Sequence, residues 1–317
     1  MQNYELIILG AGVAGMAAAV EAAENGIKDI LILEQDCYGG IMNEFIDNSY
    51  GEKVFGYEVT GPEYVDYLRD KLYKFNIEIK ENTKVIDICF DHKITYVNSI
   101  SGVQSVKGAA IIMAMGAKEK YEPNVMMPIK GITGVATIGE AHRMITIEGY
   151  FIGNDTIITG KDLYSAILAR RIILEGGHVK SLIFRRKLSK EKDKDILSIV
   201  EDFKIPIIER AEITEIFGDV RVSKVEIRNI ENNEIKEIEC DSLILSGVFR
   251  GMSELAEKIG IKVNEKTKDI IVNDFKTSIP GFFACGNIID SENMFKTNEE
   301  NNFLCGEKAS MYIKNSL

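Results

Sequence analysis

Three glycines near the start of the chain have the spacing of a phosphate-binding turn. They are Gly10, Gly12 and Gly15, in a Gly-x-Gly-x-x-Gly pattern. The first allows a tight turn, the second leaves room for a pyrophosphate beside the backbone, and the third lets a helix pack closely on a strand. Glu34 follows about twenty residues later, where a carboxylate can accept hydrogen bonds from the ribose hydroxyls of an adenosine. This combination points to a bound dinucleotide.

The surrounding residues predict the elements that such a site requires. An apolar run at 6–9 precedes the turn, an alanine-rich stretch follows it, and a second apolar run at 30–33 ends at Glu34. A helix that begins in the turn directs free N–H groups and the positive end of its dipole toward phosphates. Because strand, helix, second strand and acid agree, the pattern indicates a dinucleotide site rather than a glycine-rich turn alone.

Length and composition are those of a globular protein with two domains. The chain has 317 residues, of which 45% are hydrophobic and 27% charged, enough for two cores. The net charge of -11 disfavours nucleic acid and anionic membranes as partners, since their phosphates would repel this surface. The longest apolar run, 6–20, is too short to span a bilayer, and no basic residue precedes it. We therefore expect a cytoplasmic protein.

The cysteines and histidines lack the spacing of a metal site. The five cysteines are scattered and no two form a C-x-x-C pair, while the three histidines are isolated in sequence. Neither a zinc nor an iron–sulfur pattern is visible, so we expect no metal. In a reducing compartment these thiols would be free.

A second strand–helix–strand pattern begins near residue 153. An apolar strand at 156–160 is followed by a helix at 163–175 and by another strand at 179–184. Two such units in one chain are an internal repeat of the nucleotide-binding type.

The second unit departs from the glycine motif. Gly160 is retained, but Asp162 replaces the middle glycine and Ser165 the third. A side chain at 162 blocks close approach, and its carboxylate repels a pyrophosphate. Against this, Arg185 and Arg186 follow the second strand, where an arginine can hold an adenosine 2′-phosphate. We expect a degenerate NAD(P) site rather than a working one, with Gly160, Arg185 and Arg186 as its candidate contacts.

These pieces, in this order, resemble the two-dinucleotide-binding-domain flavoproteins of the thioredoxin-reductase-like group. Besides the first motif, the resemblance rests on a strand that ends Ala114-Met115-Gly116 and on the late motif Ala284-Cys285-Gly286-Asn287 before a final helix. In that group these motifs usually end Ala-Thr-Gly and Gly-Asp. A narrower similarity, through 39–43 and 60–64, is to the FAD/NAD-linked oxidoreductases encoded beside bacterial glycerol-3-phosphate dehydrogenases and to the FAD subunits of dye-linked dehydrogenases.

The resemblance implies an α/β fold of two Rossmann-like, three-layer domains, with the second inserted in the first. The FAD-binding domain would comprise 1–118 and 248–317, and the inserted NAD(P)-binding-like domain 119–247. The crossover would run through 121–128. Thr60 and Glu63 have the spacing of a capping box, which predicts a helix start.

The same resemblance implies FAD as the cofactor. Its ADP half would lie on the first motif and Glu34, and its isoalloxazine beside Gly39, Gly40 and Asn43. A helix start near Asn298 would face the flavin pyrimidine edge. The backbone of Val85 would meet the adenine, and Gly286 and Asn287 the ribityl chain and pyrophosphate. The full set of expected cofactor contacts is Gly10, Gly12, Ala14, Gly15, Glu34, Gly39, Gly40, Asn43, Val85, Ala114, Gly116, Gly286 and Asn287.

The expected activity is that of an FAD-dependent oxidoreductase without a dithiol/disulfide centre. It would move electrons between a reduced donor and a partner redox protein, a dehydrogenase subunit or a small acceptor. An NAD(P)H-dependent flavin reductase and a non-catalytic flavin-bound subunit are the alternatives. No catalytic residue is identified, Cys285 is interpreted as a small buried residue, and a homodimer is expected by analogy with the group.

Overall fold

The computed structural model describes residues 1–46, 50–120, 131–293 and 299–316. The crossover predicted at 121–128 and the helix start predicted near Asn298 lie outside these residues. The chain divides into two compact units, Met1–Lys118 with Phe249–Leu317 and Glu119–Val248. The crossings lie in β7 (Ala117–Lys120) and β16 (Val248–Gly251). The expected second boundary, 247/248, differs from this division by one residue.

Seven described strands form the sheet of the first unit, in the order β3-β2-β1-β6-β5-β4, with β17 also paired to β6. The pairs β1–β2, β2–β3, β1–β6 and β6–β17 are parallel, while β4–β5 and β5–β6 are antiparallel. The strands are β1 (Gln2–Leu9), β2 (Ile30–Leu33), β3 (Glu78–Lys80), β4 (Lys84–Ile88), β5 (Lys93–Asn98), β6 (Gly102–Met113) and β17 (Phe282–Ala284).

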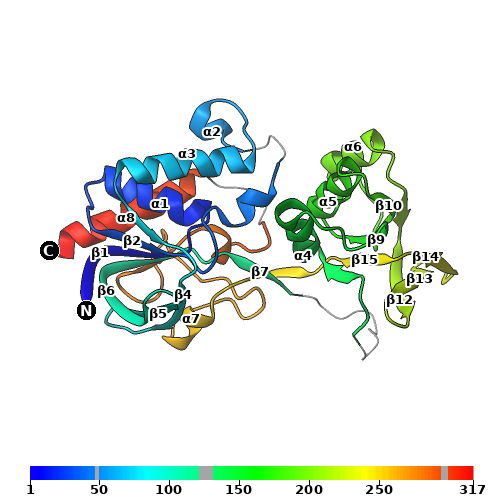
Figure 1. Ribbon diagram of the computed structural model, residues 1–317. Coiled ribbons are helices and arrows are strands. Elements are labelled where there is room, and N and C mark those ends of the chain that lie inside the picture. Colours follow the sequence, from blue (N-terminus) through cyan, green and yellow to red (C-terminus); the bar gives the residue numbers. More distant parts are fainter. Residues whose placement is uncertain (47–49, 121–130, 294–298, 317) are drawn as a thin grey trace. The chain divides into compact units, whose positions relative to one another are not determined.

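Helices cover one face of this sheet and a hydrophobic cluster covers the other. α1 (Val13–Glu24) packs between α3 (Gly61–Lys74) and α8 (Glu299–Ser316) (Figure 1). On the opposite face, side chains of the central strands pack with α7 (Glu254–Lys258) and with residues 259–289. Because both faces are covered, β2 is buried at every position, as a central parallel strand requires. The short helices are η1 (Gly40–Glu44), α2 (Glu52–Phe55) and η3 (Gly286–Ile288).

The long strand β6 in the middle of the first unit changes its neighbour partway along its length. Residues 103–106 and 109–113 both belong to the single strand β6. The first half of β6 pairs with β5, and its second half pairs with β17 on that same side. Exchange of one neighbour for another lets the strand continue without a break.

The second unit also has three layers. Its parallel sheet has the order β11-β10-β9-β15-β8, with α4, α5 and α6 packed together beside it. An antiparallel sheet, β12-β13-β14, shares a hydrophobic cluster with the parallel sheet. The elements are β8 (Val135–Thr137), α4 (Ile138–Arg143), η2 (Met144–Glu148), β9 (Asp155–Gly160), α5 (Leu163–Leu174), β10 (His178–Phe184), α6 (Lys194–Asp202), β11 (Ile207–Glu209), β12 (Ala211–Gly218), β13 (Val222–Asn229), β14 (Ile235–Glu239) and β15 (Ser242–Leu245).

Both units therefore have the expected Rossmann-like α/β arrangement, and the second interrupts the sequence of the first. Within the described ranges, no helix has both the length and the apolar composition that crossing a membrane requires. The same residues contain no group of three or more histidine, cysteine or acidic side chains arranged to hold a metal ion.

Candidate dinucleotide sites

The first glycine motif forms a tight turn between β1 and α1. Gly10 has a φ of +101°, and a Cβ there would lie 2.4 Å from the carbonyl oxygen of Ala114. A Cβ on Gly15 would lie 2.0 Å from the carbonyl oxygen of Gly10. These two glycines thus let the turn, the helix and the end of β6 pack together. Ala114 lies against the turn and donates its N–H to Leu9 (2.8 Å).

Gly12 is placed differently, because its side faces open space. A Cβ at this position would meet no atom of the described residues within 4 Å. Gly12 is also the N-cap of α1, so the first N–H groups of the helix follow it directly. Free N–H groups beside an open backbone position are what a phosphate group needs.

Two further segments meet the start of α1. The N–H of Gly39 donates to the carbonyl of Ala11 (2.7 Å), and a Cβ on Gly40 would lie 3.3 Å from the Cα of Gly12. From the end of β17, a Cβ on Gly286 would lie 2.5 Å from the Cβ of Ala14. Two segments far apart in sequence therefore approach this helix terminus at glycines. We call the arrangement of Gly12, Gly39, Gly40 and Gly286 the glycine cradle.

Glu34 is held at the edge of the glycine cradle. Its Oε2 accepts the N–H of Ala11 (2.7 Å), and its Oε1 accepts the N–H of Asp36 (2.9 Å). Each carboxylate oxygen can accept a further hydrogen bond. A ribose bound beside the turn would thus meet a fixed, preoriented acceptor.

The remaining predicted contacts differ in how they relate to the cradle. Asn43 folds back within its own loop, where its Nδ2 donates to the carbonyl of Tyr38 (2.8 Å). Gly116 follows β6 with a φ of +74° and accepts the N–H of Met252 (3.0 Å). Val85 lies in β4, pairs with Tyr96 and packs its side chain on the core. Asn287 is half-buried in η3. Ligand contacts by these residues stay predictions.

The structure also brings together two cysteines that are twenty residues apart. Cys285 and Cys305 are both fully buried, as expected for Cys285. The Sγ of Cys285 lies 3.8 Å from the carbonyl oxygen of Ala14. Burial raises the pKa of the Cys305 thiol well above its ordinary value, and a hydrogen bond with Cys285 raises it further. No spacing motif in the sequence marks this pair.

At the second glycine-like motif, a carboxylate occupies the start of the helix. Asp162 is the N-cap of α5, and its Oδ1 accepts the N–H of Tyr164 (3.1 Å). The hydroxyl of Ser165 donates to the carbonyl of Asp162 (2.5 Å). Burial raises the pKa of Asp162. A Cβ on Gly160 would lie 2.5 Å from the ring of Phe184, so this glycine serves the packing of β9 against β10.

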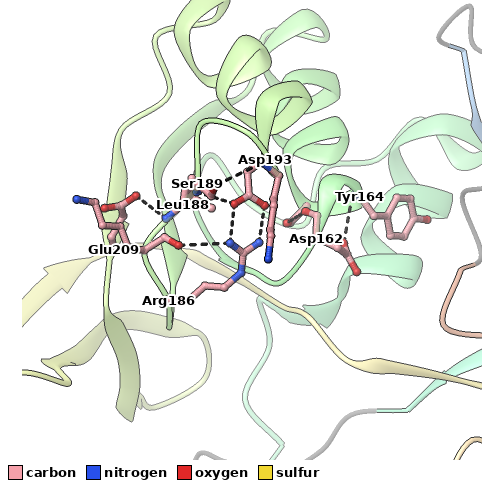
Figure 2. A network of polar contacts seen from close by, with 10 residues as sticks. Asp162, Tyr164, Arg186, Leu188, Ser189, Asp193 and Glu209 are labelled. Atoms are coloured by element: carbon pink, nitrogen blue, oxygen red, sulfur yellow. Dashed lines mark hydrogen bonds and ion pairs between the residues drawn. The ribbon is translucent and has the colours of Figure 1, made fainter.

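The two predicted arginines are ion-paired inside the same unit. Arg186 donates two hydrogen bonds of 2.6 Å each to the carboxylate of Asp193 (Figure 2). Asp193 also accepts the N–H of Ser189 (2.7 Å), and its side chain is only 6% exposed. The Arg186 guanidinium lowers the pKa of Asp193 to about 2. Arg185 pairs with Glu212 (2.9 Å).

Comparison with known proteins places the chain in a family. The family model described as pyridine nucleotide-disulphide oxidoreductase matches residues 4–301. The ferredoxin–NADP reductase of Picrophilus torridus is 26% identical over 305 residues, which cover 92% of this chain and 87% of that protein. The thioredoxin reductase of Mycolicibacterium smegmatis is 25% identical over 297 residues, covering 90% and 89%.

Solved structures show the same fold. The thioredoxin reductase of T. acidophilum has a TM-score of 0.76 at 21% identity and covers 100% of this chain and 99% of its own. The bacillithiol disulfide reductase of Bacillus cereus has a TM-score of 0.78 at 17% identity and covers both chains fully. Thioredoxin-reductase-like proteins bind FAD and NAD(P)H, and these relatives are FAD-dependent oxidoreductases. The match along 4–301 shows that the chain belongs to the pyridine nucleotide-disulphide oxidoreductase family.

Proposed function

We propose that this protein is an FAD-dependent oxidoreductase that passes electrons between a reduced donor and a partner redox protein or small acceptor, without a Cys-x-x-Cys centre. The observation that supports it best is the glycine cradle. No described residue lies within 4 Å of a Cβ built on Gly12 at the start of α1, and Gly40 and Gly286 approach the same terminus from two other segments.

The residues of the cradle fit FAD. The N–H groups that follow Gly12 would donate to the pyrophosphate, and the positive end of the α1 dipole would favour its charge. Glu34 would accept the ribose hydroxyls from the position that Ala11 and Asp36 impose. Gly39 and Gly40 would leave room for the flat isoalloxazine, and Asn287 would offer a neutral amide to the ribityl chain.

When bound, FAD supplies the redox chemistry, while the protein contributes binding, orientation and electrostatics. Two hydrogen bonds fix the loop at 38–43. Asn43 donates to Tyr38 within the loop, and Gly39 donates to Ala11 of the turn. A loop fixed at both points would present the ring in one orientation to a donor or acceptor.

The cysteines support an acceptor outside this chain. No two of them have C-x-x-C spacing, and Cys285 and Cys305 are fully buried. A raised pKa keeps the Cys305 thiol protonated, whereas thiol–disulfide exchange requires the thiolate. Electrons would therefore pass from the flavin directly to the partner.

The names of the relatives suggest small redox proteins as candidate partners. These relatives are a ferredoxin–NADP reductase, a thioredoxin reductase and the 34.2 kDa protein in the rubredoxin operon of Clostridium pasteurianum, which is 24% identical over 90% of this chain. The narrower resemblance suggests a dehydrogenase subunit.

Reconstitution with FAD tests this function. Protein stripped of cofactor and refolded with FAD is expected to retain the flavin absorbance bands after gel filtration. After anaerobic reduction by dithionite, mixing with oxidised ferredoxin, rubredoxin, thioredoxin or a quinone is expected to restore the oxidised spectrum with at least one of them. A protein that never retains FAD would refute the proposal. Retained flavin that no acceptor reoxidises would favour the non-catalytic subunit instead.

A further inference from the structure

The inserted unit presents a test of whether NAD(P)H fits this chain as it fits the family. A working site at this fold position needs free N–H groups at the start of the helix, room beside them for a pyrophosphate, and, for NADPH, a cation free to bind the 2′-phosphate. The first unit meets the first two requirements at Gly12. The second unit repeats the same strand, turn and helix, so the two can be compared element by element.

The start of α5 already holds a negative group. The carboxylate of Asp162 accepts the N–H of Tyr164, one of the donors that a pyrophosphate would use. At the equivalent place in the first unit, the N-cap is Gly12, which has no side chain to make such a bond. A pyrophosphate at α5 would therefore have to displace the half-buried Asp162 and to overcome the repulsion of its carboxylate, which is stronger there than in bulk water.

Arg186, the arginine that could bind a 2′-phosphate, is already paired with a carboxylate. Both N–H groups that Arg186 uses toward Asp193 form bonds of 2.6 Å. Asp193 is buried and receives a third bond from the backbone of Ser189. Figure 2 shows the Arg186 guanidinium, which follows β10, bonded to both carboxylate oxygens of Asp193, the residue before α6. Such a two-pronged pairing is the geometry in which arginine binds carboxylates and phosphates most strongly.

The second arginine is similarly engaged. Arg185 pairs with Glu212 of β12, and the same carboxylate also pairs with Arg228 of β13 at 2.5 Å. Glu212 is 19% exposed on its side chain, whereas Arg185 is 62% exposed. A phosphate at Arg185 would compete with a carboxylate already anchored by a neighbouring strand.

We propose that the second nucleotide site is occupied by the chain's own carboxylates, Asp162 in place of the pyrophosphate and Asp193 in place of the 2′-phosphate, so that NAD(P)H is not the electron donor of this protein. The family's NAD(P)H therefore does not fit the residues present, and the donor is a redox protein or an organic substrate acting at the flavin. The kinetic part of this inference rests on the proposed function, whereas nucleotide binding by the inserted unit does not.

Nucleotide binding is measured first, on the FAD-loaded protein. Calorimetric titration with NADP⁺ and with NAD⁺ at millimolar concentration is expected to show no saturable binding to the wild type. Anaerobic stopped-flow mixing with NADPH or NADH is expected to leave the flavin absorbance unchanged on the time scale of catalysis. Saturable binding of either nucleotide to the wild type, or rapid bleaching of the flavin by either, would overturn the inference.

Substitution of Asp162 tests whether removing its carboxylate creates nucleotide binding. Asp162→Gly removes the carboxylate and restores the middle glycine, and it is expected to tighten NADP⁺ binding at least about tenfold beyond the wild-type limit. Asp162→Asn removes the charge but keeps an N-cap, and a smaller gain is expected. Asp195→Gly, at an exposed carboxylate in the first turn of α6, is the matched control and is expected to gain nothing. If both Asp162 variants fold and neither binds more tightly than the control, the inference is wrong.

Asp193→Asn, made in the Asp162→Gly background, tests the second half. It weakens the paired bonds between Arg186 and residue 193, so that the guanidinium can contact a 2′-phosphate. Binding is therefore expected to shift in favour of NADP⁺ over NAD⁺ relative to Asp162→Gly alone. An unchanged preference would refute the role given to Asp193. FAD content and dithionite reduction are recorded for every variant. Loss of FAD from the wild type would count against the proposed function, while nucleotide binding by the wild type would count against this inference only.

Discussion

Gly12→Ala is expected to weaken FAD binding about ten- to hundredfold while leaving the fold intact. The two effects separate because a Cβ at this position would meet no described atom within 4 Å. The added methyl would instead enter the space in which a pyrophosphate would approach the backbone. The substitution therefore examines the cofactor site without disturbing the protein that surrounds it.

The expected cost to folding is close to zero. Gly12 has a φ of -66° and a ψ of 171°, which alanine adopts without strain. Alanine is a poorer N-cap than glycine by roughly 0.5–1 kcal/mol, but it lowers the entropy of the unfolded chain by about 0.4–1 kcal/mol. The two terms offset, so the free energy of unfolding should change by less than about 0.5 kcal/mol.

The expected cost to binding comes from lost hydrogen bonds. Displacing the pyrophosphate would break at least one bond from a backbone N–H to a charged oxygen, worth about 1.5–3 kcal/mol. Since each 1.4 kcal/mol is about tenfold in affinity, one lost bond raises the Kd for FAD about ten- to hundredfold.

Two measurements check this prediction. Circular dichroism gives the Tm of the apoprotein, and fluorescence titration gives the Kd for FAD. Gly131→Ala is the matched control, because a Cβ there also meets no described atom within 4 Å and the position is exposed in the inserted unit. An unchanged Kd in Gly12→Ala would show that the pyrophosphate does not approach Gly12, and a collapse of the apoprotein Tm would refute the packing argument.

Three further outcomes are expected. Gly15→Ala should destabilise the apoprotein by about 1–3 kcal/mol, seen in denaturant melts, because its Cβ would lie 2.0 Å from the Gly10 carbonyl oxygen; unchanged stability would contradict the close packing. Arg186 lowers the pKa of Asp193 from 3.8 to about 2, so the stabilisation from this pair is present above pH 3.8 and is lost as the pH falls through about 2. Asp193→Asn should flatten the Tm over that acid range, and an equally steep fall would refute the pairing. With a thiol reagent, Cys37, which is exposed, should react first, whereas the buried Cys240, Cys285 and Cys305 should react only on unfolding; fast labelling of three or more thiols would contradict their burial.

Local features of the chain could be predicted from sequence because they depend on neighbouring residues. The turn, the helix that follows it and the strand before Glu34 arise from glycine spacing and apolar periodicity. The capping box at Thr60 and Glu63 is present, with Thr60 accepting the N–H of Glu63 and the Glu63 carboxylate accepting the N–H of Thr60. Strands β12 and β14 were not predicted, because charged residues interrupt their short apolar stretches. They are ordered by pairing with β13 and by the hydrophobic cluster that they share with the parallel sheet.

By itself, the sequence determined that a glycine turn joins the first strand to a helix, that a second unit repeats this pattern, and that Asp162 replaces the middle glycine there. Only the tertiary structure decided what surrounds each motif. It brings Gly40 and Gly286 to the start of α1, and it places Asp193 and Glu212 on the two arginines that sequence spacing assigned to a phosphate. The physical reason is that an arginine's partner is set by distance in space. Asp193 lies seven residues after Arg186, and Glu212 lies twenty-seven after Arg185. Neither separation follows a helix or strand period, yet each carboxylate pairs with the arginine whose positive charge a phosphate would need.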